Sequence, residues 1–188
     1  MGKKDQLRDE ILQVQKENQA LFERLKQLQA EVHQFEKAQA ENENEAKALV
    51  EELESLRMIT GAVKVKGPGV VVSLRDASYA PEQDNPNHYI VHEEHIQEVI
   101  HELFVSGAEA ISINGQRISY NSYILCIGPV VEVDGVQHNA PFKIAAIGDP
   151  DKLYSSLNLK GNVKDRLVEY GIEVAIEKKS EIVMEPLL

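Results

Sequence analysis

The chain has 188 residues, a formal net charge of -11 at neutral pH and a single cysteine. This acidic balance, without any cluster of Lys and Arg, excludes a protein that binds the backbone of nucleic acids. One cysteine excludes an internal disulfide, and no apolar stretch in the sequence is long enough to span a membrane.

Core positions of a heptad, most of them apolar, recur at alternating spacings of three and four from Leu7 to Leu56, a span without Gly or Pro. This spacing indicates a coiled coil, because a lone helix in water has nothing to cover such a stripe. We therefore predict a coiled-coil stalk over residues 1–59. Its predicted dimerisation residues are Leu7, Ile11, Val14, Asn18, Leu21, Leu25, Leu28, Val32, Phe35, Leu49, Leu53 and Leu56.

The composition of the core positions predicts the type of assembly. Leu dominates the d positions, and Asn18 occupies an a position, where two Asn side chains satisfy each other only in register. We therefore expect the chain to pair with a second copy of itself as a parallel dimer. Gln39, Asn42 and Ala46 fill three consecutive core positions, so we expect a loose segment there. The alternative is a helix that folds back on its own domain.

Residues 60–188 are predicted to form one globular domain. Turns are expected at Gly67-Pro68-Gly69 and Asn114-Gly115, and a surface loop at residues 80–87. Apolar and β-branched runs predict strands at Val63–Val65, Val70–Leu74, Ala110–Ile113, Arg117–Ser119, Tyr123–Val133, Phe142–Ile147, Ile172–Ile176 and Ile182–Met184.

Three helices are expected between these strands. The first runs from His92 to Val105. The second begins after Asp149 as N-cap, with Pro150 at its first position, and the third begins near Asn162. The inward stripe predicted for the first helix is Ile96, Val99, Ile100, Leu103 and Phe104. The order of elements predicts an α/β (α+β) domain with a mixed sheet, preceded by a long coiled-coil helix.

No pattern of catalytic residues or cofactor-binding glycines occurs in the sequence, so we predict neither an enzyme nor a cofactor. His92 and His95 lie on one face of a helix, but their spacing differs from the zinc-protease pattern and no third ligand follows at a recognisable distance. We therefore predict no metal site.

A group of polar residues follows the apolar strand that begins at Ala110. Its members are Glu109, Asn114, Gln116 and Arg117, which form the candidate ligand-binding group. Arg117 offers a planar fork for a carboxylate or phosphate. The competing interpretation, which we favour, pairs Arg117 internally with Glu109 or Asp76.

Three segments of the domain carry a resemblance to a known family. They are Gly67-Pro68-Gly69-Val70 with Asp76, the run 107–118 (Gly-Ala-Glu-Ala-Ile-Ser-Ile-Asn-Gly-Gln-Arg-Ile), and Ala145-Ala146-Ile147-Gly148-Asp149-Pro150. Together with the stalk, they make the chain resemble the YlxW/YlxX-type family, a bacterial family of unknown function.

The resemblance implies properties that the composition does not. Such proteins carry a transmembrane segment before the coil, so that the domain faces outside the cytoplasm at the cell membrane. Their genes lie near cell-division genes, and no catalytic activity is established for them. This chain lacks the membrane segment, which we interpret as a truncation. The leading hypothesis is a membrane-tethered scaffold with envelope or division proteins as partners, and the alternative is a sensor of a small ligand or ion.

Overall fold

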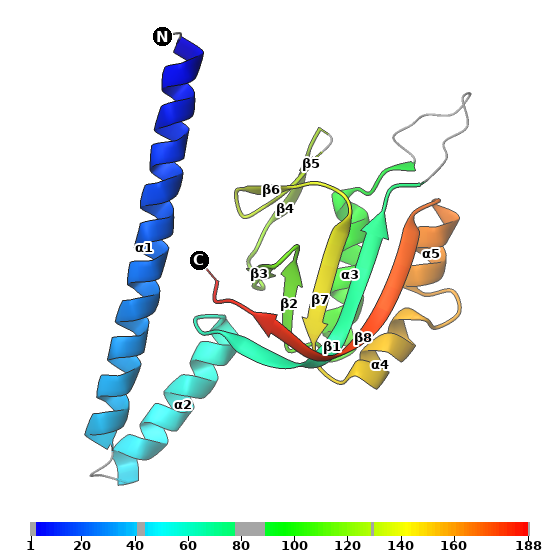
Figure 1. The fold of residues 1–188 in the computed structure, drawn as a ribbon. Coiled ribbons are helices and arrows are strands. Elements are labelled where there is room, and N and C mark those ends of the chain that lie inside the picture. Colours follow the sequence, from blue (N-terminus) through cyan, green and yellow to red (C-terminus); the bar gives the residue numbers. More distant parts are fainter. Residues whose placement is uncertain (1–2, 41–43, 78–88, 129, 188) are drawn as a thin grey trace. The chain divides into compact units, whose positions relative to one another are not determined.

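The computed structural model describes residues 3–40, 44–77, 89–128 and 130–187. The chain divides into two compact units, residues 1–56 and 57–187, so the division falls inside a helix. The elements are α1 (Lys3–Ala40), α2 (Asn44–Thr60), β1 (Val65–Arg75), α3 (Glu93–Val105), β2 (Ala110–Ile113), β3 (Gln116–Ile118), β4 (Ile124–Ile127), β5 (Val130–Val133), β6 (Val136–His138), β7 (Phe142–Ile147), α4 (Pro150–Leu157), α5 (Val163–Glu169) and β8 (Glu173–Met184). A long N-terminal helix followed by an α+β domain confirms the predicted fold class (Figure 1).

The stalk is not one continuous helix. In an unbroken helix, His33 and Glu54 would lie roughly 30 Å apart at the usual rise per residue. Instead, the Nε2 atom of His33 lies 3.1 Å from Oε1 of Glu54, and Nζ of Lys37 lies 3.2 Å from the same oxygen. The chain therefore reverses direction between α1 and α2, which corrects the prediction of an unbroken coil. Asn42, in the segment expected to be loose, and the surface loop expected at residues 80–87 lie outside the described residues.

A five-stranded sheet in the order β3-β2-β7-β1-β8 forms the centre of the domain. All pairings of its described strands are antiparallel, whereas the sequence predicted a mixed sheet. Three helices, α3, α4 and α5, cover one face of this sheet (Figure 1). The buried residues between them include Val70, Val72, Leu74, Ile96, Val99, Leu103, Ile111, Ile144, Leu153, Leu157 and Leu167.

Several predicted boundaries are corrected. The predicted turn at residues 67–69 lies within the single strand β1, which passes through it with a change of register between Gly67 and Gly69. Gly69 is required there, because a Cβ atom at this position would lie 1.8 Å from the carbonyl oxygen of Ala146. The strands expected at residues 172–176 and 182–184 are one strand, β8, since both ends pair with β1.

A second, three-stranded sheet in the order β4-β5-β6 contains the segment predicted as one long strand over residues 123–133. That segment instead forms two paired strands. The Asn114-Gly115 turn was predicted correctly, and both of its residues have the positive φ angles, 49° and 87°, that a tight hairpin turn requires. The start of α4 was also predicted correctly, because the Asp149 side chain accepts hydrogen bonds from the backbone N–H groups of Asp151 and Lys152.

Candidate functional site

Arg117 is buried in β3, and its partners differ from those expected. Its Nη1 atom donates to the carbonyl oxygen of Val63 and its Nη2 atom to that of Met58, each at 2.7 Å. Neither expected carboxylate is the partner of these donors. Oδ1 of Asp76 instead accepts the backbone N–H of Val91 at 2.8 Å.

The Met58 carbonyl lies in the last turn of α2, where carbonyl groups have no partner within the helix. A cation at this end also complements the negative pole of the helix dipole. Arg117 therefore holds the last turn of α2 next to β3. Burial lowers the pKa of the guanidinium below its usual value.

The other residues of the candidate ligand-binding group are also bonded internally. Oδ1 of Asn114 accepts the backbone N–H of Lys143 at 2.7 Å, which ties the hairpin to β7. The Gln116 side chain donates to the carbonyl oxygen of Val133 at 3.0 Å, and its Oε1 atom lies 2.7 Å from Nε2 of His138. Glu109 donates its backbone N–H to the Ile147 carbonyl. These contacts connect strands, and they do not gather the four side chains around a common cavity.

We expect replacement of Arg117 by Met to lower the free energy of unfolding by about 2–4 kcal/mol, since two charge-assisted hydrogen bonds are lost. The Met58 carbonyl would keep the backbone N–H of Gly61, at 3.3 Å, as its remaining donor. Thermal melts measure the loss of stability, and melts with added phosphate test whether an anion stabilises the protein. The exposed Arg75, replaced by Met, is the control and should melt like the wild type. A variant with unchanged stability that loses an anion-dependent stabilisation seen in the wild type would contradict this structural role.

The two histidines singled out in the sequence lie at the start of α3, His92 as its N-cap and His95 in its first turn. Nδ1 of His95 accepts the backbone N–H of His92 at 3.0 Å, and the buried His95 ring lies beside Tyr170. Burial is the main cause that lowers the pKa of His95, and the neighbouring Glu94 opposes this effect. Within the described ranges, no group of three or more His, Cys, Asp or Glu side chains is placed to hold a metal ion.

The lowered pKa predicts a dependence of stability on pH. The unfolded chain binds a proton at His95 near pH 6.5, whereas the folded chain resists it, so we expect the free energy of unfolding to decrease as the pH falls through about 6.5. Protonation of Nδ1 would also remove the acceptor for His92. Urea denaturation at pH 7.5 and 5.5 should show a smaller loss for His95→Gln than for the wild type. Burial also lowers the pKa of His138, so a His138→Gln variant is the matched comparison for the loss of stability between the two pH values. An equal loss in wild type and His95→Gln would count against His95 as the source.

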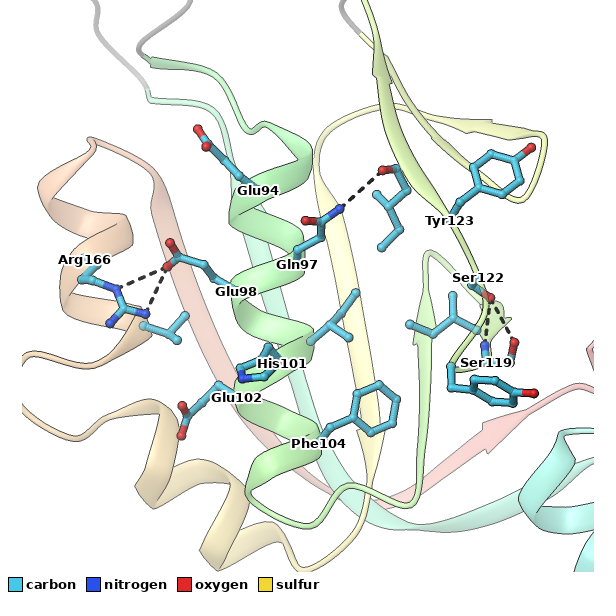
Figure 2. Close-up of a pocket in the computed structure, with 15 residues that line it drawn as sticks. Glu94, Gln97, Glu98, His101, Glu102, Phe104, Ser119, Ser122, Tyr123 and Arg166 are labelled. Carbon is cyan, nitrogen blue, oxygen red and sulfur yellow. Dashed lines mark hydrogen bonds and ion pairs between the residues drawn. The ribbon is translucent and has the colours of Figure 1, made fainter.

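An open groove of about 890 Å³ lies over the outer face of α3 (Figure 2). We call it the α3 groove. Residues of α3, of the segment 118–124 and of α5 line it: Glu94, Gln97, Glu98, Ile100, His101, Glu102, Phe104, Ile118, Ser119, Tyr120, Ser122, Tyr123, Ile124, Val163 and Arg166. None of the four candidate ligand-binding residues is among them.

Hydrogen bonds and an ion pair fix the walls of the α3 groove. Gln97 donates to the carbonyl oxygen of Ile124 at 3.5 Å, and Arg166 lies 3.2 Å from Oε2 of Glu98 (Figure 2). Glu102 accepts hydrogen bonds from the hydroxyl groups of Ser156 and Ser106. The bond from Ser156 is the main cause that lowers the pKa of Glu102, so this carboxylate is ionised at neutral pH.

Aromatic side chains line the same groove without being buried. Phe104, predicted to face the core, is 43% exposed, and Tyr120 is 97% exposed. The pKa of Tyr123 is raised by loss of hydration and then by the negative charges of Glu132 and Asp134. The α3 groove thus combines an apolar lining with a surplus of carboxylates over cationic side chains.

The sequence did not reveal this groove. Phe104 falls within the helical stripe, yet it lies at the edge of the buried arc, where a change of a few tens of degrees decides between core and surface. Tyr120 and Tyr123 lie between two strands, and no spacing rule connects them to α3.

Comparison with known proteins identifies the family. The family described as "Bacterial protein of unknown function (DUF881)" matches residues 52–187. The chain belongs to this family. It is 49% identical over 182 residues to UPF0749 protein YlxW of Bacillus subtilis (strain 168), covering 97% of this chain and 79% of that protein. This confirms the resemblance found in the sequence.

More distant relatives extend the similarity. UPF0749 protein Rv1823 of Mycobacterium tuberculosis (strain ATCC 25618 / H37Rv) is 29% identical over 83% of this chain and 54% of its own length. The chain thus spans about half of this mycobacterial relative. A crystal structure of an uncharacterized conserved protein from Mycobacterium tuberculosis superposes with a TM-score of 0.62 at 28% identity, covering 72% of this chain and 91% of that one.

Proposed function

We propose that the chain is a non-enzymatic scaffold in which α1 self-associates and displays the α+β domain to a partner. The observation that carries this proposal is the exposure of the predicted dimerisation stripe along α1. Its residues Leu21 and Phe35 are 67% and 66% exposed within the single chain. Leu7, Ile11, Val14, Leu25, Leu28 and Val32 are exposed as well. A contiguous apolar stripe of this kind marks an interaction surface.

The contacts between α1 and α2 do not cover this stripe. The ion pairs of Glu54 with His33 and Lys37 involve side chains that remain about one-third or more exposed. Such pairs contribute at most about 1 kcal/mol each, so burial of the stripe would outweigh them. Because the chain reverses after α1, pairing in register would use the stripe from Leu7 to Phe35 and leave Leu49, Leu53 and Leu56 in a separate helix.

The sensor alternative rests on Asn114, Gln116 and Arg117 as ligand contacts. The side chains of these residues already bond to Lys143, Val133, His138, Met58 and Val63. A ligand would have to displace those bonds, so the scaffold is the function that the geometry supports better.

We expect the protein to sediment as a dimer at tens of micromolar concentration. Replacing Leu21 and Leu28 by Ala should weaken association by roughly 2 kcal/mol or more for each buried side chain. Glu23→Ala, on the opposite side of the heptad, is the control and should remain dimeric. A wild-type protein that sediments as a monomer would refute the proposal.

Replacing Asn18 by Ile should raise the melting temperature and allow oligomers other than the dimer.

A tether to the cell membrane, with the domain outside the cytoplasm and close to envelope or division proteins, is part of the proposal and rests on family resemblance. None of the helices in the described part of the chain is both long and apolar enough to span a bilayer.

Fractionation of the bacterium that encodes the protein tests the tether. We expect the natural protein in the membrane fraction, resistant to salt and released by detergent. Protease added to intact protoplasts should digest the domain. Recovery in the soluble fraction would refute the tether. Protection from protease would show that the domain lies on the cytoplasmic side of the membrane.

A further inference from the structure

We infer that the α3 groove docks a segment of a partner protein that carries Lys or Arg among apolar residues. The inference names the kind of partner to which the proposed scaffold would present its domain, and in that sense it rests on the proposed function. It comes from the domain alone and uses no residue of the stalk.

The apolar part of the groove provides anchoring contacts. Phe104, Tyr120 and Tyr123 are exposed, and Ile100, Ile118 and Ile124 lie around them. Exposed aromatic side chains around an open groove are typical of the central residues of protein interfaces. These aromatic side chains are not part of the buried core. The face of α3 that packs on the sheet consists of Ile96, Val99 and Leu103.

The negative charge of the groove favours a positively charged partner segment. Glu94, Glu98 and Glu102 recur every four residues, so they stand on successive turns along one face of α3 (Figure 2). Outside the groove lining, Glu132 accepts the Tyr123 hydroxyl at 3.4 Å and Asp134 accepts the Tyr123 backbone N–H at 2.9 Å, so both carboxylates lie beside this tyrosine. Among the residues that line the groove, Arg166 is the one Lys or Arg, and Glu98 already neutralises it. Cationic side chains on an incoming segment would therefore meet unbalanced carboxylates.

The shape and charge favour a peptide over other ligands. The groove follows α3 from Glu94 to Phe104, a length of about 15 Å along the helix, and it is open to solvent. A small-molecule site instead encloses most of its ligand. Nucleic acids and anionic lipid surfaces carry negative charge and would be repelled by these carboxylates.

Selection from a phage-displayed library of random linear peptides on the full-length protein tests the inference. We expect enriched peptides that combine Lys or Arg with aliphatic or aromatic residues. Their binding, measured by fluorescence anisotropy of the synthesised peptides, should weaken as salt is added. Enrichment of acidic or uncharged peptides, or no enrichment, would overturn the inference.

Variants locate the binding. Tyr120→Ser and Glu94→Gln should each weaken binding of the selected peptides by about tenfold. Both side chains are exposed, so folding should be unaffected, which melting curves verify. Leu159→Ser and Glu181→Gln are matched exposed controls outside the groove and should bind like the wild type. Equal binding by groove variants and controls would place the peptide elsewhere and overturn the inference.

The two proposals fail separately. If the protein binds the peptides but sediments as a monomer, self-association is refuted and the docking role of the groove stands. If the protein is a dimer but selects no basic peptide, the docking role of the groove is refuted and self-association stands.

Discussion

The burial of one face of the five-stranded sheet is the constraint on which the domain depends. Val70, Val72 and Leu74 of the inner strand β1 are fully buried, and α3, α4 and α5 supply the apolar side chains opposite them. Because β1 pairs with β7 on one side and β8 on the other, its position fixes both neighbours. The close approach at Gly69, which leaves no space for a Cβ atom, lets β1 remain paired through its change of register.

The orientation of α3 follows from the same burial. Once Ile96, Val99 and Leu103 face the sheet, the helical period turns Glu94, Gln97 and His101 toward solvent. The segment from Ile118 to Ile124 then passes beside this outer face on its way from the large sheet to the small one. The α3 groove is therefore a consequence of the way the core is packed.

Arg117 and the heptad stripe of α1 differ in their surroundings. One hydrogen bond from the buried guanidinium holds the Met58 carbonyl in the last turn of α2, and the other holds the Val63 carbonyl, which lies between α2 and β1. Leu21, Leu28 and Phe35 of the apolar stripe on α1 are exposed.

The sequence by itself determined the features that depend on local chemistry. The length and start of α3, the Asp149 cap with Pro150 and the Asn114-Gly115 turn were predicted because each depends on residues close together in the chain. The heptad spacing likewise predicted the long helix α1, although not its reversal before α2. The reversal depends on contacts between residues about twenty positions apart, which a periodic pattern does not contain.

Only the tertiary structure decided the pairing and the sites. β1 and β8 extend through glycine and charged residues because long-range hydrogen bonds between them replace what local propensity lacks. Arg117 found backbone carbonyls of Met58 and Val63, about sixty residues earlier, in place of the carboxylates that charge alone suggested. The α3 groove joins side chains of α3, α5 and the segment 118–124. Their proximity is a product of packing, and packing depends on all of the chain at once.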